Sequence, residues 1–414
     1  MDWLFPVALA LTGAMGVGMA LWGLWYVLAG VMCLRRPTDY GRHPKQTRFA
    51  VLIAARNEEL VIGPLINSLL TQNYPEELYD VWVIPNNCTD HTARAARGFG
   101  AKVLECTVPV KSKGEVLRFA YDRLRGRGYD AWCVFDADNL AHPDFLAEMN
   151  NAYLAGAKAA QGYRDSKNPH DTPLSGCSSL YYWMMDRFHN GGRAGASLSA
   201  MITGTGFMIS SGLLERLGGW NSSTISEDLE LTAQCVMAGE RVWWVPKAIT
   251  YDEQPLTWAE SLKQRRRWSS GTLQVAGIYL PIVWKRMGEQ PGLTLMDLGV
   301  TLLIPLYQVA ALASLACNAL AAVLGGATPF QSLLAALAVL VIQVGSAALT
   351  ATLAAVAIMA TERKWDRRMV PALATYWLFL LSWLPITVAS FWKRTTVWEE
   401  IRHTRNVTPE ALAR

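Results

Sequence analysis

Phe49-Ala50-Val51-Leu52-Ile53-Ala54-Ala55 runs directly into Arg56-Asn57-Glu58-Glu59, and this junction gives the first indication of the fold. An apolar run of this length that ends in polar residues is typical of a buried β-strand. Apolar positions at helical spacing follow it, at Leu60, Ile62, Leu65 and Leu69. The segment therefore predicts a strand that passes straight into a helix.

Further segments repeat this order along the chain. Val81–Ile84 ends at Asn86, and Trp132–Phe135 ends at Asp136. A short strand is predicted between them at Lys102–Leu104. Strands that alternate with helices predict an α/β domain with a mainly parallel sheet flanked by helices and right-handed crossovers. The polar motifs then fall at the carboxyl ends of the strands, where open α/β sheets bind ligands. No G-x-G-x-x-G follows the first strand, so the pattern for a dinucleotide-binding domain is weak.

Apolar sequence surrounds this domain on both sides. The chain has 414 residues, of which 51% are hydrophobic and 17% charged. The hydrophobic residues concentrate in the first 34 positions and after about position 290. We predict a transmembrane helix at 1–34, a globular domain at 35–257, an interfacial amphipathic segment at 258–293, about three transmembrane helices within 294–392, and a basic tail at 393–414.

Basic residues indicate which side of the membrane the domain occupies. Arg35 and Arg36 follow the first span at once, which predicts a cytosolic domain and a multi-pass protein of the cell membrane. The spans expected near 295–324, 333–359 and 370–392 place the tail outside by parity. The tail nevertheless carries Lys393, Arg394, Arg402 and Arg405, which favour the cytosol. Either the last segment is re-entrant or the number of spans is wrong, and the side of the tail stays open.

Charge and cysteine content narrow the class of function. The net charge is only +4, and the sequence has no RNA- or DNA-binding motif, which argues against a nucleic-acid partner. The seven cysteines show no C-x-x-C spacing. This argues against both a disulfide framework and a zinc site.

Asp136-Ala137-Asp138 closes a predicted strand in the middle of the domain. Two carboxylates at such a strand end can ligate Mg²⁺ or Mn²⁺, which also bridge to phosphates. D-x-D is also common in turns. His142 lies four residues further on and could reach a metal, but a turn residue before Pro143 is the favoured explanation.

Ser226-Glu227-Asp228 opens a predicted apolar helix. Asp228 could act as a general base that accepts the proton of an acceptor hydroxyl. The alternative is a helix N-cap, with Ser226 as the capping residue and Glu227 in the first turn.

Gln264-Arg265-Arg266-Arg267-Trp268 combines a basic cluster with an aromatic ring. Arg267 can bond phosphate oxygens in a bidentate way, and Trp268 offers a flat face to a sugar ring. The alternative is a basic patch that binds anionic lipid, for which Arg265 and Arg266 are suited. Thr203-Gly204 could let the backbone approach a ligand, and Lys111 and Lys113 could meet phosphate or ribose.

In this order, these motifs resemble the family 2 inverting glycosyltransferases, and most of all the membrane-integrated cellulose, chitin, hyaluronan and poly-N-acetylglucosamine synthases. The resemblance covers about residues 48–270. It implies a GT-A fold, a UDP-sugar donor, Mg²⁺ or Mn²⁺, and inversion at the anomeric carbon. The resemblance implies that the catalytic residues are Asp228 and Glu227, and that a metal is bound by Asp136 and Asp138. The residues that it implies for binding the nucleotide sugar are Ala55, Asn57, Glu58, Asn86, Lys113, Asp136 and Arg267. Those that it implies for binding the acceptor are Gln264, Trp268, Thr203 and Gly204.

The resemblance predicts an enzyme that extends a β-linked polysaccharide and couples synthesis to secretion. Two alternatives stay open: transfer of one sugar to a lipid-linked acceptor, and a catalytically silent export subunit. Membrane lipids are expected partners, and oligomerisation or a partner subunit is compatible with the sequence. One position departs from the family, because Asn86 stands where the relatives have an aspartate that contacts uracil. The identity of the donor is therefore less well defined than the chemistry.

Overall fold

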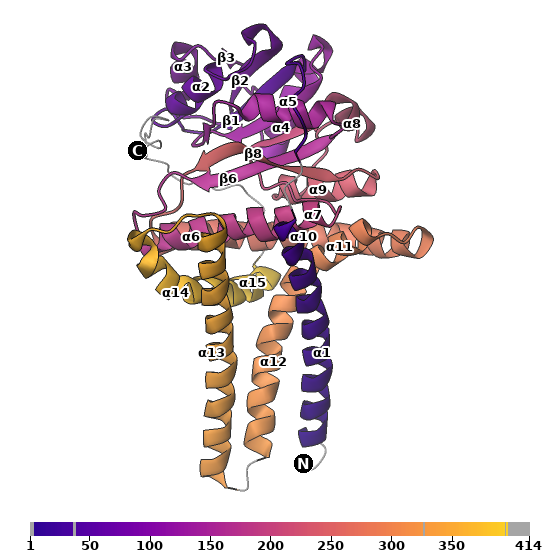
Figure 1. The fold of residues 1–414 in the computed structure, drawn as a ribbon, viewed down its shortest axis with the longest axis vertical. Coiled ribbons are helices and arrows are strands. Elements are labelled where there is room, and N and C mark those ends of the chain that lie inside the picture. The colour runs from indigo at the N-terminus through magenta and orange to yellow at the C-terminus, as the bar shows by residue number, and fades with distance from the viewer. Residues whose placement is uncertain (1–3, 36–38, 326–327, 394, 396–414) are drawn as a thin grey trace.

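The computed structural model describes residues 4–35, 39–325, 328–393 and 395. Three levels follow one another along the long axis of the molecule (Figure 1). An α/β domain lies at one end, a layer of helices crosses beneath it, and three long helices extend away from that layer. The ligand-binding edge of the domain therefore faces the helical layer.

The α/β domain is built on one eight-stranded sheet with the order β3-β2-β1-β4-β7-β6-β8-β5. Neighbouring strands are parallel from β3 to β4, and β6 pairs with β8 in parallel. β7 runs antiparallel to both β4 and β6, and β5 runs antiparallel to β8. The strands are β1 (Phe49–Ala55), β2 (Tyr79–Pro85), β3 (Lys102–Val103), β4 (Ala131–Asp136), β5 (Leu140–Ala141), β6 (Ala159–Ser166), β7 (Phe207–Ser210) and β8 (Val242–Asp252). The α/β class and the four predicted strands are confirmed, and the sheet is mixed because β7 reverses direction.

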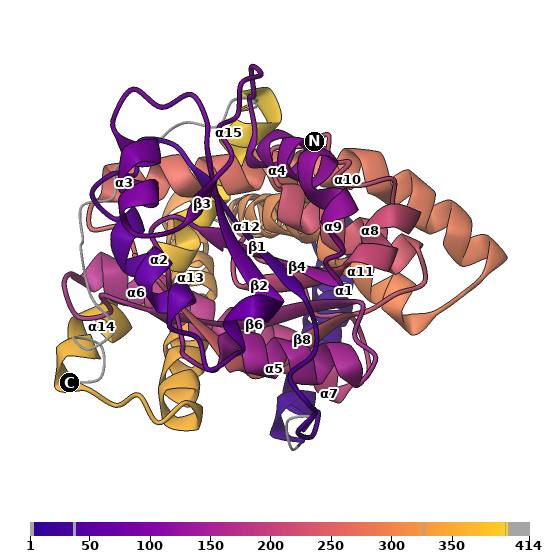
Figure 2. The same cartoon turned by 90° about the horizontal axis from the view of Figure 1, so that it is seen from above.

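Helices cover both faces of this sheet, as Figure 2 shows from above. All seven residues of β1 are buried, because alternate side chains pack against helices on opposite faces. The helices of the domain are α2 (Ile62–Leu70), α3 (Thr92–Gly98), α4 (Lys113–Leu124), α5 (Phe145–Leu154), α8 (Ser211–Arg216) and α9 (Glu227–Met237), with short 3₁₀ turns at Glu76–Leu78 and Arg125–Arg127.

The helical layer lies between the sheet and the long helices (Figure 1). It contains α6 (Pro173–Met184), a π-helical turn (Met185–Gly191), α7 (Gly192–Gly195), α10 (Trp258–Glu289), α11 (Leu293–Leu302), α14 (Val370–Leu381) and α15 (Trp383–Trp392). The long helices are α1 (Leu4–Val31), α12 (Ile304–Leu324) and α13 (Pro329–Thr361), with 3₁₀ turns at Met32–Leu34 and Arg367–Met369.

Four helical segments in the described residues are long and apolar enough to cross a membrane, judged by length and composition. They are Leu9–Leu34, Ile304–Leu324, Pro329–Thr361 and Arg367–Trp392. Two predicted spans differ from the structure. The segment expected at 295–324 breaks at Leu303, so that only α12 joins the long helices. The segment expected at 370–392 breaks at Ser382, and α14 and α15 lie just beneath α6 and α10, beside the upper parts of α13 and α12 (Figure 1).

The end of α13 is fastened to the α/β domain by charged side chains. Glu362 pairs with Arg187 Nε at 2.9 Å and accepts a hydrogen bond from Tyr163 Oη at 3.0 Å. Lys364 Nζ donates to Asp165 Oδ1 at 2.5 Å. The basic loop that follows α13 therefore lies on the same side as the α/β domain.

The chain after α15 returns to that side as well. Thr395 donates its N–H to Ser270 Oγ at 3.3 Å and accepts a hydrogen bond from Gln274 Nε2 at 3.0 Å, both on α10. Up to Thr395 the chain therefore lies beside α10, and the membrane side of the tail stays a prediction. The predicted basic tail beyond this point lies outside the described residues.

A buried ion pair joins three parts of the fold. Arg193 of α7 donates through Nε and Nη2 to the two carboxylate oxygens of Asp297 of α11, at 2.7 and 3.0 Å. Trp25 Nε1 of α1 donates to the same carboxylate at 2.8 Å. The exposed fractions of Arg193 and Asp297 are only 1% and 3%. This carboxylate therefore holds α1, α7 and α11 together.

We expect Asp297→Ala to lower the free energy of unfolding by about 3–5 kcal/mol, because it leaves a buried guanidinium without its counter-charge. Thermal unfolding of the purified protein in detergent would measure the loss. Glu240→Ala is the matched control, since it removes half of an exposed pair, Arg216–Glu240, and should cost no more than about 1 kcal/mol. Equal losses in the two variants would contradict the role given to Asp297.

Candidate active site

A cavity of about 640 Å³ lies at the carboxyl ends of β1 and β4 and continues among the helices α12, α13, α14 and α15. Eleven of the residues predicted for the site line it: Glu58, Lys113, Asp136, Asp138, Thr203, Gly204, Glu227, Asp228, Gln264, Arg267 and Trp268. They come from segments that are far apart in the sequence. The fold therefore brings these motifs together around one cavity.

Asp136, the last residue of β4, meets a cation from another element. Lys113 Nζ, at the start of α4, donates to Asp136 Oδ1 and also to the Gly204 carbonyl, the latter at 2.7 Å. Burial opposes the ionisation of Asp136, but the charge of Lys113 outweighs it and holds the pKa of this carboxyl below its usual range. Asp136 is therefore ionised at neutral pH.

Asp136 and Asp138 form a suitable half-site for a divalent metal. No group of three or more His, Cys, Asp or Glu side chains in the described part of the chain could hold a metal by itself. Mg²⁺ and Mn²⁺ need no such cage when a substrate supplies phosphate oxygens, because one or two carboxylates then suffice. The donor set thus fits a metal that binds together with a diphosphate.

Glu227 and Asp228 stand at the start of α9 with their side chains toward the cavity. Burial raises the pKa of Asp228, against the opposing charges of Lys113, Arg164 and Arg267. Burial and the charge of Asp228 raise the pKa of Glu227 to about 7. Ser226 occupies the N-cap position, but its side chain makes no capping hydrogen bond. The positions predicted by the capping alternative are therefore confirmed, with Glu227 and Asp228 in the first turn of α9, while the side-chain cap bond is not formed.

Two glycines from other segments lie close to the segment Ser226–Asp228, one on each side. Gly204 has a positive φ of 90°, and a Cβ there would lie 3.4 Å from Asp228 Oδ2. On the other side, a Cβ at Gly271 of α10 would overlap the Ser226 hydroxyl. These two glycines let the carboxylate segment lie directly between the Thr203–Gly204 loop and α10.

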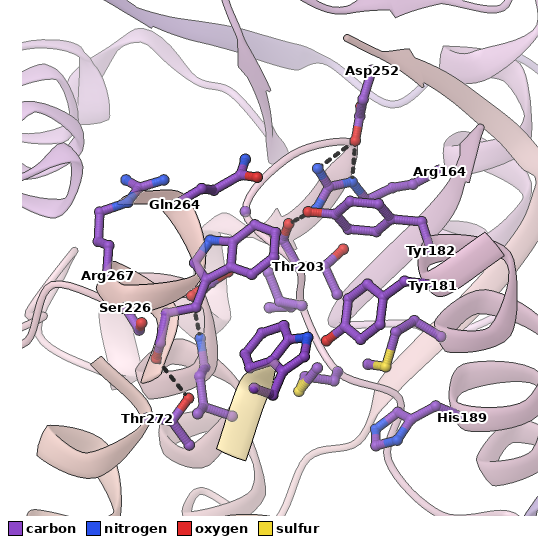
Figure 3. Close-up of a pocket in the computed structure, with 18 of the residues that line it drawn as sticks. Arg164, Tyr181, Tyr182, His189, Thr203, Ser226, Asp252, Gln264, Arg267 and Thr272 are labelled. Carbon is purple, nitrogen blue, oxygen red and sulfur yellow. Dashed lines mark hydrogen bonds and ion pairs between the residues drawn. The ribbon is translucent and has the colours of Figure 1, made fainter. Parts of the chain in front are cut away.

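The helical spacing of Gln264, Arg267 and Trp268 places all three on one face of α10, toward the cavity. Figure 3 shows Gln264 and Arg267 on the same side of the pocket, near Ser226. Arg267 Nε is buried without a hydrogen-bond partner among the described residues. The positive charge of Arg267 favours the ionised form of three carboxyl groups. It adds to the lowering of the pKa of Asp136, and it opposes the rise in the pKa of Glu227 and Asp228. Arg267 is thus oriented to meet a negatively charged ligand.

Arg265 points away from the cavity and is 1% exposed. Its Nη1 donates to Phe379 O at 3.1 Å and to Ser382 Oγ at 2.5 Å, at the break between α14 and α15. Its guanidinium carbon lies 4.5 Å from the centre of the Phe379 ring and 5.7 Å from that of Trp383. The lipid-patch interpretation is therefore wrong for Arg265, whereas Arg266 is exposed.

Several residues of the site were not predicted from the sequence. Arg164 of β6 donates through Nε to Asp252 Oδ2 at 2.6 Å, and its guanidinium lies 4.2 Å above the Tyr182 ring (Figure 3). Burial raises the pKa of Asp252 to about 6, against the charge of Arg164. Tyr181 and His189 also line the cavity. One local feature of the sequence indicated this pair: Arg164 lies inside a strand, and a charged side chain in a buried strand needs a partner.

Three predicted nucleotide contacts lie just behind the cavity rather than on its wall. Asn86 Nδ2 donates to the Ala55 carbonyl at 2.9 Å, and its Oδ1 accepts from Arg56 Nε at 3.3 Å. Asn57, with a φ of 57°, accepts from the Thr89 N–H at 2.8 Å through its side chain. These bonds hold the loop that carries Arg56 and Glu58, which do line the cavity. Direct nucleotide binding by Ala55, Asn57 and Asn86 stays a prediction.

His142 does not join the carboxylates. Its Nδ1 accepts a hydrogen bond from the Asp144 N–H at 3.2 Å, and it is not part of the cavity wall. The turn explanation is therefore the one that the structure supports.

The raised pKa values predict an acidic limb in the pH–rate profile. Because a general base must be ionised, kcat/KM should fall on the acidic side as Asp228, whose pKa burial raises, takes up a proton, while the neighbouring Glu227 takes up its own proton with a pKa of about 7. Glu227→Gln should shift this limb to lower pH by roughly one unit, since it removes the neighbouring negative charge. A limb at the same pH in both proteins would show that this pair does not control the reaction.

Comparison with known proteins agrees with this arrangement. A family model described as "Glycosyltransferase like family 2" matches residues 44–271. The chain is 30% identical over 253 residues to "Probable glycosyltransferase YdaM" of Bacillus subtilis (strain 168), covering 58% of each protein. It is 26% identical over 306 residues to "Beta-monoglucosyldiacylglycerol synthase" of Nostoc sp., covering 67% of this chain and 63% of the relative.

The fold also matches that of a solved structure. The mannosyltransferase PcManGT from Pyrobaculum calidifontis, solved in complex with GDP-Man and Mn²⁺, superposes with a TM-score of 0.60 at 20% identity. The superposition covers 94% of this chain and 98% of that one. Because the family model covers more than half of the chain, this protein belongs to glycosyltransferase-like family 2.

Proposed function

We propose that this protein transfers a sugar from a nucleotide-diphosphate sugar to a hydroxyl group of a membrane lipid. One observation carries the proposal. The cavity that contains Asp136 and Asp228 is continuous with a space lined by apolar residues of the membrane-side helices: Ile304, Ala311, Ala347, Ala351, Leu380, Leu381 and Leu384. A molecule with a hydroxyl at one end and a hydrocarbon chain at the other matches both ends of this cavity.

The polar end supplies the groups that the reaction needs. The acceptor oxygen attacks the anomeric carbon, and Asp228 takes the hydroxyl proton. The bond from that carbon to the diphosphate oxygen breaks, the nucleoside diphosphate leaves with the electron pair, and attack from the opposite face inverts the carbon. Arg267 stabilises the negative charge of the leaving group. A Mg²⁺ or Mn²⁺ held by Asp136 and Asp138 would supply further positive charge to the diphosphate.

The relatives add support without fixing the substrates. The Nostoc relative is named for the synthesis of a glucosyl lipid, and the Pyrobaculum structure contains a sugar nucleotide and Mn²⁺. The family resemblance favours UDP as the nucleotide. Asn86 keeps the choice of donor open, since its side-chain oxygen is already bonded to Arg56.

We also propose a membrane arrangement. α1, α12 and α13 cross the bilayer, whereas α10, α14 and α15 lie at its surface with the α/β domain in the cytosol. The basic loop after α13 and Arg35, which donates to the Gly195 carbonyl at 3.1 Å, lie on the domain side and support this orientation.

Extension of a β-linked polysaccharide is the second candidate. It is favoured by Gln264–Trp268, which resembles the polymer synthases, and by aromatic rings beside Trp268. Only three long helices, however, extend from the domain in the described residues. This small number of helices favours the lipid acceptor over a threaded polymer chain.

A product assay distinguishes the two candidates. Purified protein in phospholipid vesicles with Mn²⁺ is screened against UDP- and GDP-sugars for nucleotide release, and the active donor is then used with a radiolabel. We expect the label in the organic-solvent extract as a lipid with one added sugar. Label in a ladder or a high-molecular-weight polymer would support the polysaccharide candidate instead. No nucleotide release from any donor would favour a catalytically silent subunit.

A further inference from the structure

Three aromatic side chains from three different elements meet between the polar and the apolar ends of the cavity. They are Tyr181 of α6, Trp268 of α10 and Trp383 of α15, and all three line the cavity. We call this group the aromatic wall. It lies where the head group of a membrane molecule would enter the site.

The rings of the aromatic wall are nearly parallel to one another. The Trp268 and Trp383 centroids are 6.0 Å apart with an interplanar angle of 20°, and those of Tyr181 and Trp383 are 5.8 Å apart at 29°. Tyr181 and Trp268 are 6.4 Å apart at 18°. The three rings are therefore stacked against one another and form one aromatic cluster in the lining of the cavity.

A polar group also remains available at this wall. Trp383 Nε1 is buried and has no hydrogen-bond partner among the described residues. A buried N–H without a partner is costly, unless a ligand supplies the missing acceptor. The wall therefore combines flat apolar faces with a donor, and a pyranose ring presents the matching apolar C–H face and hydroxyl oxygens.

The break between α14 and α15 is what brings Trp383 to the wall. Arg265 donates to Phe379 O and to Ser382 Oγ, so it bonds the carbonyl end of α14 and the residue that precedes Trp383. Arg265 lies between Gln264 and Arg267 in the sequence. The motif that faces the diphosphate thus also fixes the position of the aromatic wall, and Arg265 is a positioning residue.

We propose that the acceptor is a glycolipid whose terminal sugar ring binds against Tyr181, Trp268 and Trp383 while its hydrocarbon chains extend among α12, α13 and α15. This inference rests on the proposed function and names its substrate class. A hydroxyl of the bound sugar attacks the donor's anomeric carbon, gives its proton to Asp228 and displaces the nucleoside diphosphate. The protein then adds a second or later sugar, and another glycosyl transfer to a lipid must supply its substrate.

The proposed glycolipid acceptor is tested by assaying its sugar part and its hydrocarbon part separately. With the active donor, kcat/KM is measured for a panel of dodecyl glycosides, for the corresponding methyl glycosides, and for dodecanol and dioleoylglycerol. We expect at least one dodecyl glycoside to be used about tenfold or more better than either the chainless sugars or the sugarless lipids. Equal or better use of dodecanol or dioleoylglycerol, or no use of any dodecyl glycoside, would overturn the glycolipid proposal. Methyl glycosides that match the dodecyl compounds would overturn the lipid acceptor itself.

Variants of Trp383 test the wall directly. Trp383→Ala should raise KM for the dodecyl glycoside about tenfold, and Trp383→Phe should recover part of this loss because a flat ring remains. Trp392→Ala is the matched control, since Trp392 lies on the same helix and is 78% exposed. An unchanged KM in Trp383→Ala, or the same increase in Trp392→Ala, would remove Trp383 from the acceptor site.

Discussion

Asp228→Asn should reduce sugar transfer by about 10³-fold, the middle of the range for the loss of a general base. The amide keeps the size of the side chain and its place between Gly204 and α10, but it cannot accept a proton at neutral pH. The affinity for the nucleotide should change little, because the phosphate contacts that we propose are those of Lys113 and Arg267. Transfer is measured with labelled donor, and nucleotide binding is measured by calorimetry on the same preparation.

Asp228→Glu sharpens the assignment. It retains a carboxylate but adds a methylene, which moves the carboxylate oxygens away from the position that they hold in Asp228. We therefore expect this variant to lose most of its activity too, since a base must lie within hydrogen-bond reach of the proton it accepts. Parallel losses of transfer and nucleotide affinity in Asp228→Asn would instead show that Asp228 binds the donor.

Arg267→Ala should slow transfer by about 10²–10³-fold, comparable with the loss of a group that stabilises charge in a transition state. The guanidinium lies against the cavity with an unpartnered Nε and influences three carboxylates, so its removal leaves the leaving diphosphate without a cation on that side. Arg267→Lys should recover only part of the rate, because an ammonium cannot form the bidentate bond.

Arg266→Ala is the control for this prediction, since Arg266 is adjacent in sequence but exposed. Its turnover in detergent should stay near that of the unaltered protein. If Arg266→Ala and Arg267→Ala lost activity equally, the effect would belong to the basic character of α10 as a whole. Unchanged turnover in Arg267→Ala would return Arg267 to a role in lipid binding.

Much of the fold could be predicted because its signals are local. The strands around Val51 and Val134 are buried on both faces, so they appear as continuous apolar runs that end in polar residues. The motifs at Asp136, Asp228 and Arg267 converge because they follow or face the same edge of the sheet. Their convergence could be predicted from the general rule that ligands bind at the carboxyl ends of parallel strands.

The remaining features depend on contacts between distant residues. Two short apolar helices that meet at a break have the same composition as one long apolar helix, so α14 and α15 resembled a single span. The break at Ser382 is stabilised by Arg265, 117 positions away. Arg164 and Asp252 likewise come from separate strands, and neither identifies the other in the sequence.

The continuity of the cavity between the carboxylates and the membrane-side helices has a consequence for the energetics of lipid modification. Drawing a lipid out of a bilayer into water costs about 0.8 kcal/mol for each exposed methylene group. Lifting ten methylenes would cost about 8 kcal/mol, as much as the entire binding energy of a micromolar complex. A site that meets the hydroxyl at the surface of the bilayer avoids this extraction, so the hydrocarbon can stay in an apolar environment throughout the reaction. The helices around the cavity would then act as an extension of the membrane that reaches up to the catalytic base.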